Sequence, residues 1–237
     1  FAIRRQRQMC IRDSLYNDML KDLIQKKTPF IDVRSPSEFN QGSIPLSINI
    51  PILNDMEREI VGKAFKSNGQ EIAKKIGHEL VSGKIKNNRV NEWKEFIEAN
   101  PRSWLYCARG GLRSEIAQSW LKDIGLIIDR VDGGFKSIRN FCLEVFEHIN
   151  EGNKDWIVLA GRTGSDKTGM INKLNNSIDL EGLANHRGSA FGARSTKQPS
   201  PVNFENSLAF KYIHHKSYKL VLEDESRTIG RLVIPPK

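Results

Sequence analysis

Residues 103–114 read SWLYCARGGLRS, which combines a short apolar run, a cysteine, two glycines and the first residues of a helical pattern. The run before Cys107 predicts a buried strand, and the amphipathic LRSEIAQSWLKDIG that follows predicts a helix stopping at Gly125. Gly110 and Gly111 allow the connecting loop to curl, so that successive N–H groups face inward beside the positive end of the helix. This order of elements predicts an α/β fold with an anion-binding loop.

The side chains of this loop indicate nucleophilic chemistry. Arg109 and Arg113 lie close to Cys107 in the sequence, and with the helix N-terminus they favour the thiolate form of the cysteine. A thiolate held in such a loop suits the transfer of a charged or polarisable group. The alternative is that Cys107 is a small buried core residue, as lone cysteines often are.

Strand and helix patterns alternate along the rest of the chain. The predicted strands are PFIDVR, SWLYC and IIDRVDGG, and the predicted helices include residues 68–82, 88–99 and 134–150. The polar EGNKD that follows the last of these helices is typical of a linker, and a new strand, loop and helix then begin at WIVLAGRTGSDKTGMINKL. The alternation predicts mostly parallel sheets flanked by helices in two domains, residues 15–151 and residues 152–237.

Residues 161–168, GRTGSDKT, nearly match the phosphate-binding pattern G-x-x-x-x-G-K-[ST]. Asp166 stands where the last glycine is expected. A carboxylate about 4 Å from a bound phosphate would repel it by about 4 kcal/mol, roughly a thousandfold in affinity. Asp tolerates a left-handed backbone better than most residues, so the loop shape can survive. The residues predicted to bind phosphate are Gly161, Thr163, Gly164, Ser165, Lys167 and Thr168.

Two further polar segments of the second domain contain candidate residues. His186 and Arg187, in ANHRGSAFG, suit contact with a phosphate or an RNA backbone, and a solvated loop is the alternative. The strand-like YKLVL ends in the acidic residues 223–225, a place where phosphate-loop proteins hold a metal-binding acid. Carboxylates that are simply solvated are equally consistent with this pattern. We select Glu225 and Arg227 as candidates because both lie in the string ESRTIG.

Composition limits the classes of protein that the chain can belong to. The excess of 37 Lys and Arg over 28 Asp and Glu gives a net charge of +9, which favours polyanionic partners such as nucleic acid. Three cysteines without a C-x-x-C pair predict neither a disulfide framework nor a metal centre. No apolar run approaches the roughly 18 residues that cross a bilayer. We therefore expect a cytoplasmic protein with no membrane contact, and the arginine-rich residues 1–14 read as a non-native segment.

Two sets of motifs resemble a known family. IDVRSPSEFNQGSIPLSINIP is similar to the rhodanese signature, and YCARGGLRS resembles the rhodanese active loop C-x-x-G-x-x-R. The matching signature residues are Asp32, Arg34, Glu38, Phe39, Gly42, Ile44, Asn49 and Pro51, whereas Ser43 replaces a frequent histidine. GRTGSDKT, DLEGLANHRGSAFG and LVLEDESRTIG then follow in the order found in tRNA 2-selenouridine synthases, which fuse a rhodanese domain to a phosphate-loop domain. The resemblance runs from residue 15 to residue 237 and implies a further C-terminal portion after IPPK.

The resemblance implies a function in tRNA modification. Such enzymes replace the sulfur of 2-thiouridine at the wobble position of tRNA with selenium from selenophosphate, after S-geranylation from geranyl diphosphate. Cys107 would hold or deliver selenium with Arg109 and Arg113 beside it, Lys167 would contact a diphosphate, and Thr168 is a candidate ligand of Mg²⁺. No tightly bound cofactor is expected, and the oligomeric state stays open. The alternatives are a simpler sulfurtransferase with a degenerate phosphate loop and a non-catalytic tRNA-binding fragment.

Overall fold

The computed structural model describes residues 16–149, 154–161, 165–188 and 192–235. The chain forms two compact units, one of residues Thr28–Ile138 and one that combines Phe1–Lys27 with Arg139–Lys237. The segment 1–14, which the sequence suggests is non-native, lies outside the described residues. The boundary expected near residue 152 stays a prediction.

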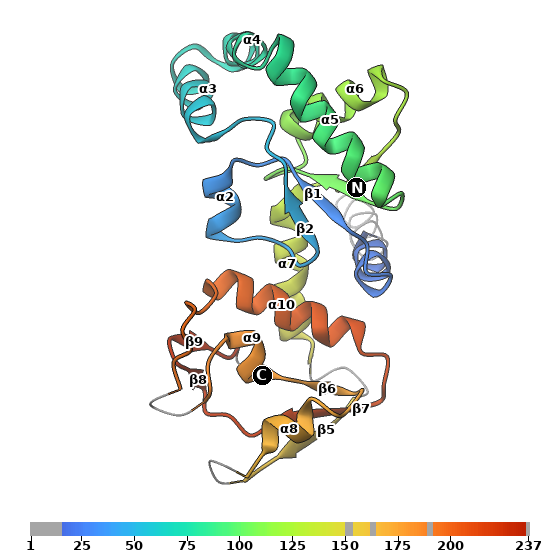
Figure 1. Cartoon of the computed structure of the whole chain (residues 1–237), viewed down its shortest axis with the longest axis vertical. Coiled ribbons are helices and arrows are strands. Elements are labelled where there is room, and N and C mark those ends of the chain that lie inside the picture. Colours follow the sequence, from blue (N-terminus) through green and yellow to red (C-terminus); the bar gives the residue numbers. More distant parts are fainter. Residues whose placement is uncertain (1–15, 150–153, 162–164, 189–191, 236–237) are drawn as a thin grey trace, which may run out of the picture. The chain divides into compact units, whose positions relative to one another are not determined.

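A parallel four-stranded sheet organises the first unit (Figure 1). Its strand order is β2-β1-β3-β4, with every pair parallel. The strands are β1 (Phe30–Asp32), β2 (Ser47–Asn49), β3 (Trp104–Tyr106) and β4 (Asp129–Arg130). The helices are α2 (Pro36–Gln41), α3 (Asp55–Asn68), α4 (Gln70–Leu80), α5 (Gly83–Ala99), α6 (Leu112–Asp123) and the start of α7 (Gly134–Glu147), which belongs to the other unit from Arg139 onward. Parallel strands joined through helices confirm the predicted α/β class.

Two helices of this unit differ from the sequence-based prediction. α3 was not predicted, because only Glu57 and Ala64 of its residues are buried and its larger apolar side chains point outward. The helix predicted at residues 88–99 is longer than expected, since α5 (Gly83–Ala99) already begins at Gly83 after a gap of only two residues from α4. The buried face of α5, formed by Val90, Trp93 and Ile97, anchors this long helix on the core.

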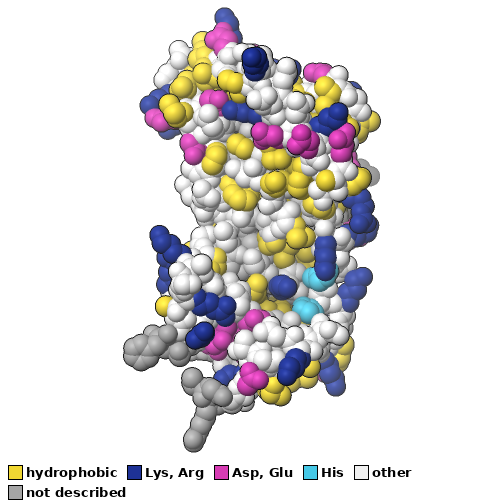
Figure 2. Space-filling view, viewed as in Figure 1, with side chains coloured by type: hydrophobic (Ala, Val, Ile, Leu, Met, Phe, Trp, Pro, Cys, Tyr) yellow, Lys and Arg dark blue, Asp and Glu magenta, His cyan; other side chains and the backbone are white. Residues whose placement is uncertain are grey.

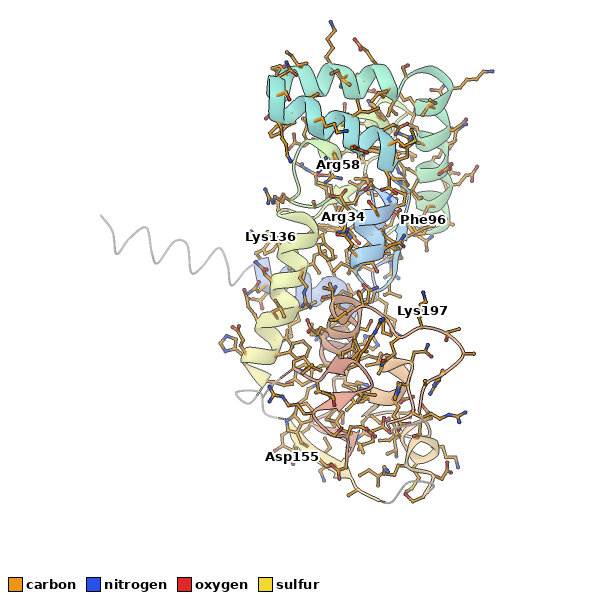
Figure 3. The ribbon with its side chains drawn as sticks, turned by 90° about the vertical axis from the view of Figure 1, so that its left-hand side faces the viewer. Arg34, Arg58, Phe96, Lys136, Asp155 and Lys197 are labelled. Carbon is orange, nitrogen blue, oxygen red and sulfur yellow. The ribbon has the colours of Figure 1, made fainter. Side chains whose placement is uncertain are left out.

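A buried ion pair, Asp32–Arg34, connects the end of β1 to the start of α7. Arg34 donates two hydrogen bonds from Nε and one from Nη2 to the Asp32 carboxylate, at 2.7 to 3.0 Å, and another from Nη2 to the Gly42 carbonyl. The Arg34 guanidinium carbon also lies 3.9 Å from the centre of the Phe135 ring, at the start of α7. Figure 3 labels Arg34 in this unit and Lys136 on α7. The pair therefore supports the element on which the Cys107 loop rests.

The second unit contains a smaller parallel sheet with the order β5-β7-β6. Its strands are β5 (Asp155–Leu159), β6 (Ser177–Ile178) and β7 (Lys219–Glu223), and an antiparallel pair adds β8 (Thr228–Ile229) and β9 (Leu232–Val233). The helices are α8 (Lys167–Ile171), α9 (Leu180–Ala184) and α10 (Pro201–His214), with residues 16–25 also helical. Among the described residues, no helix has the length and apolarity that crossing a membrane requires.

Candidate active site

Cys107 lies directly after β3, and its side chain is 3% exposed. Its Sγ atom is 3.3 Å from Ser114 Oγ, and Ser114 Oγ in turn donates to the Gly111 carbonyl at 2.8 Å. Ser114 is itself fully buried in the first turn of α6, so this contact fixes the sulfur at the base of the loop. Sequence reasoning missed Ser114, although its place seven residues after Cys107 put it on the helix facing the loop.

Neighbouring donors bind three carbonyl groups of the Cys107 loop, whereas the Gly111 carbonyl lies 3.8 Å from the sulfur. The N–H groups of Phe135 and Lys136 donate to the carbonyls of Cys107 and Ala108, at 2.8 and 3.1 Å, and Arg130 Nη1 donates to the Gly110 carbonyl at 2.9 Å. In a trans peptide the N–H points opposite to the carbonyl. In the described part of the chain, no acceptor is assigned to the N–H groups from residue 108 to residue 113. We call this set of N–H groups the cradle; the binding of an anion by it stays a prediction.

Glycines allow this loop to approach the start of α7 closely. A side chain on Gly134 would place its Cβ atom 2.2 Å from the Cys107 carbonyl oxygen, and one on Gly110 would come within 2.6 Å of the Gly133 nitrogen. Both residues also have positive φ angles, +59° and +63°, which L side chains rarely adopt. The close backbone contact therefore requires glycine at both positions.

Glu38 holds Arg113 beside the cradle. The two side chains form a bidentate pair, with Nη1 to Oε2 at 2.5 Å and Nη2 to Oε1 at 3.0 Å. Burial opposes ionisation of Glu38, but the hydrogen bonds and charge of Arg113, with smaller help from Ser35 and Arg58, lower its pKa to about 2. Burial likewise opposes the charge on Arg113, yet Glu38 and the nearby Cys107 raise the pKa of this guanidinium. Arg109, the other predicted arginine, is exposed.

A cavity of about 1080 Å³ opens onto the cradle. Cys107, Arg109 and Arg113 all line it, so the structure brings the three predicted catalytic residues to one space. The remaining walls come mainly from α3, α4 and α6. Sequence patterns did not indicate α3, and this part of the cavity wall was therefore not predicted.

The phosphate loop of the second unit is described in part. Thr163 and Gly164, two of the predicted phosphate-binding residues, lie outside the described residues. Lys167 Nζ donates to the Gly161 carbonyl at 2.7 Å, so the lysine lies over the start of the loop. A Cβ atom on Gly161 would meet Ser165 Oγ at 2.6 Å, which places the serine against the same point.

Asp166 adopts the left-handed conformation that the glycine pattern requires, with φ 59° and ψ 32°. Its carboxylate lies against the backbone of Gly169, because a Cβ atom there would be 2.3 Å from Asp166 Oδ1. The backbone thus keeps the expected shape, and the substitution adds a negative charge at the start of α8.

Three carboxylates gather beside Thr168. Glu181, Glu223 and Glu225 offer oxygen atoms that all lie within 4.8 Å of one another. Thr168 Oγ1 is 3.1 Å from Glu181 Oε2 and 3.4 Å from Glu223 Oε2. Burial, together with the charges of nearby acids, raises the pKa of Glu223 to about 7, and burial and Glu181 raise the pKa of Glu225. The sequence indicated Glu225 and Thr168, whereas Glu181 and Glu223 were not selected.

The remaining predicted residues lie around this acidic group. Gly188 touches the Glu225 carboxylate, because a Cβ atom on the glycine would be 2.2 Å from Glu225 Oε2, and ANHRG and ESRTIG therefore meet. His186 is 8% exposed, and its Nδ1 atom has no hydrogen-bond partner among the described residues. Arg187 and Arg227 are exposed, and within the described part of the chain only their backbone groups form hydrogen bonds.

Comparison with known proteins shows two domain families in this order. Residues 16–141 match the rhodanese-like domain, and residues 154–237 match the tRNA 2-selenouridine synthase AAA domain. The tRNA 2-selenouridine synthase of Shewanella denitrificans is 47% identical over 216 residues, which cover 90% of this chain and 59% of that protein. The chain belongs to the tRNA 2-selenouridine synthase family.

Other members of the tRNA 2-selenouridine synthase family match the chain with similar identity and coverage. The Sulfurovum sp. protein is 47% identical over 91% of this chain and 60% of its own length, and the Pseudomonas fluorescens protein is 44% identical over 91% and 59%. The chain thus spans about three fifths of the curated relatives it matches. Among solved structures, the N-terminal domain of a Clostridium difficile 630 protein named for ATP/GTP binding is 33% identical, with a TM-score of 0.45, over 48% of this chain and 88% of that one.

Proposed function

We propose that the chain converts 2-thiouridine at the wobble position of tRNA to 2-selenouridine, with an S-geranyl derivative as the intermediate. The supporting observation is the Cys107 loop, in which a buried sulfur, N–H groups without an acceptor among the described residues, and Arg113 lie beside one cavity. The names of the relatives agree with a selenouridine product. The first unit would therefore bind the selenium donor, selenophosphate, and its tRNA acceptor.

The proposed reaction has two steps. In the first, the sulfur of 2-thiouridine forms a bond to geranyl carbon, the carbon–oxygen bond of geranyl diphosphate breaks, diphosphate leaves, and the N3 proton of the base passes to water. In the second, selenium forms a bond to C2 of the uridine, the C2–sulfur bond breaks, and geranyl thiol leaves. Water takes the phosphoryl group from selenophosphate, and phosphate is released. Alkylation makes the sulfur a better leaving group, which explains the order of the steps.

The second unit offers residues for the diphosphate and its counterion. Lys167 supplies a positive charge above the loop, and Glu181, Glu223 and Thr168 supply oxygen atoms of the kind that Mg²⁺ prefers. The carboxylates repel one another, and a bound cation would relieve this repulsion, so the donor set fits Mg²⁺. Mg²⁺ would neutralise charge on the leaving diphosphate when bound.

Replacement of Cys107 by serine tests the selenium step. We expect Cys107→Ser to abolish selenium incorporation into tRNA while geranylation and tRNA binding remain measurable, because the serine lacks the polarisable sulfur that we propose holds the selenium donor at C2. Nucleoside analysis of tRNA by mass spectrometry would follow both products. The matched control is Cys142→Ser, since Cys142 is buried on α7 and burial raises the pKa of its thiol to about 12. Equal selenation by Cys107→Ser and wild type would exclude the proposed role.

A simpler sulfurtransferase is the second candidate function, and Asp166 favours it. In this case the Cys107 cradle would accept sulfur, and the second unit would bind no diphosphate. Measured affinity for geranyl diphosphate separates the two functions, because only the tRNA-modifying function requires it.

A further inference from the structure

The cavity beside Cys107 has an apolar wall that the selenium donor does not need. α3 contributes Val61 and Phe65, α4 contributes Ala73, and α6 contributes Ile116 and Trp120. Selenophosphate is small and anionic, so its binding is explained by the N–H groups and arginines of the cradle. A cavity of about 1080 Å³ lies at the upper end of the range of small-molecule sites. The apolar wall therefore fits a second, apolar group.

Positively charged side chains line the same cavity around this wall. Arg58, Lys63 and Lys66 lie on α3, and Lys74 lies on α4. Arg58 lies 3.8 Å from Glu38, and Lys63 pairs with Glu59 at 2.6 Å. Lys66 and Lys74 have no ion-pair partner among the described residues, so both are available to the phosphate groups of an RNA strand. Figure 2 shows hydrophobic and basic side chains side by side over the α3 and α4 end of this unit.

The spacing of residues along α3 and α4 explains why apolar and basic side chains line the same cavity. Arg58, Val61 and Phe65 recur at intervals of three and four residues, so they share one face of α3. Small residues oppose them, since Ala73 and Gly77 lie four residues apart on α4 and also line the cavity. Phe65 is 55% exposed, which is unusual for an aromatic side chain. The ring can therefore cover an apolar ligand that enters beside it.

We propose that this cavity holds the isoprenoid chain on the sulfur of the wobble uridine while selenium in the cradle faces C2. The inference rests on the proposed function and adds the place where the first unit recognises the alkylated intermediate. An unmodified thiouridine has no group to fill the apolar wall, whereas the geranyl chain leaves water on binding there. The cavity thus selects the intermediate over its unalkylated precursor, and the cationic side chains hold the flanking phosphates. No bond to the protein forms in this recognition.

The experiment compares two alkyl groups on one RNA. Anticodon stem–loops with S-geranyl-2-thiouridine or S-methyl-2-thiouridine contain the same reacting carbon and differ in the apolar chain. We expect wild type to bind the geranyl RNA at least tenfold more tightly, measured as the ratio of Kd values by fluorescence anisotropy. Selenium transfer to both RNAs is measured in parallel as KM and kcat. Phe65→Asp, which places a charge in the apolar wall, should reduce the Kd ratio to near one.

A matched variant on the same helix controls for the new charge. Ile60 is 44% exposed on α3 and does not line the cavity, so Ile60→Asp should keep the wild-type ratio. Circular dichroism of both variants verifies that α3 is still folded. A wild-type ratio near one, or a Phe65→Asp ratio equal to that of Ile60→Asp, overturns the inference. The binding ratio needs no turnover, so absence of selenium transfer to either RNA counts against the proposed function and leaves the test of the cavity intact.

Discussion

Glu38 links α2 to the first turn of α6 through a single bidentate contact. Its partner Arg113 lies 75 residues further along the chain, and the pair joins two elements around the Cys107 cradle. The carboxylate also accepts a hydrogen bond from the N–H of Ser35 at 3.1 Å. A charge held in this way both fixes a helix and orients an active-site arginine.

Loss of the Glu38 charge should weaken the fold and the site together. We expect Glu38→Gln to lower the free energy of unfolding at pH 7 by about 1–3 kcal/mol, because Arg113 loses its charged partner. The folded pKa of Glu38 is lowered from 4.5 to about 2, so its stabilisation is present above pH 4.5 and is lost as the pH falls through about 2. Urea unfolding at several pH values measures this difference.

The exposed pair Glu59–Lys63 provides the control for Glu38. Both side chains are well exposed, and Glu59→Gln should leave the unfolding curve nearly unchanged. Equal destabilisation by the two variants would contradict the structural role of Glu38.

Asp166 is the residue that decides whether the second unit binds a diphosphate. Its backbone has the required left-handed shape, so we expect Asp166→Gly to act through charge and to raise the affinity for geranyl diphosphate tenfold or more. Isothermal titration calorimetry with Mg²⁺ present measures this change. Asp155→Gly removes an equal charge at the opposite end of β5 and should leave the affinity unchanged. Equal affinities of Asp166→Gly and wild type would show that the carboxylate does not oppose binding.

At the scale of elements, the start of α7 acts as the support of the active loop. Its first N–H groups bind the loop carbonyls, and the Phe135 ring packs over Arg34. The position of the cradle thus depends on backbone contact between two segments. Side chains at Gly110 or Gly134 would separate them.

Two glycines with positive φ angles distinguish the cost of backbone strain from the cost of a steric clash with a neighbouring segment. Gly134 and Gly125 have φ angles of +59° and +81°, but a Cβ atom on Gly125 would meet nothing within 4 Å. Alanine at either position should cost about 1–2 kcal/mol through left-handed backbone strain. Only Gly134→Ala should also displace the Cys107 carbonyl, and it should reduce selenium transfer at least tenfold. Chemical unfolding and transfer assays on both variants distinguish these effects, and equal transfer rates would contradict the role of the contact.

Sequence patterns predicted the elements whose buried faces are apolar and missed those whose faces are not. PFIDVR and SWLYC contain β1 and β3, and the helix expected from residue 134 is α7. α3 has no buried apolar stripe, so it produced no helical signal although it forms a wall of the cavity. Cys107, Arg109 and Arg113, which the sequence predicted as a group, do line the same cavity. The contacts of Glu38 with Arg113 and of Glu223 with Glu181 were not predicted, because pairings across 40 or more residues depend on the sheet and leave no local pattern.

At the scale of the whole molecule, each unit contains a glutamate with a shifted pKa, and the two shifts have opposite directions. Glu38 in the first unit is held charged, whereas Glu223 in the second has a pKa raised to about 7. The Glu223 side chain is 3% exposed, and its negative charge costs stability wherever no cation compensates it. The second unit should therefore unfold more easily in mildly alkaline solution.

Thermal unfolding as a function of pH tests this difference between the units. Because the folded pKa of Glu223 exceeds its value of 4.5 in unfolded chains, its contribution is fully present below pH 4.5 and is lost as the pH rises through about 7. We expect the melting temperature of this unit to fall by at least about 2–4 °C between pH 5 and pH 8. Mg²⁺ should restore it, and Glu223→Gln should remove both effects. Asp224→Asn, an exposed neighbour, is the control, and a pH-independent melting temperature in wild type would exclude the assignment.

The open side of β5 affects how the protein behaves in concentrated solution. Within the described residues β5 pairs only with β7, and Ile157 and Val158 are 44% and 53% exposed. An apolar edge of this kind can accept an extended segment from a second molecule. The net charge of +9 keeps copies apart at low ionic strength, and salt screens that repulsion. Self-association should therefore increase with salt, and a lysine at Val158 would protect the edge.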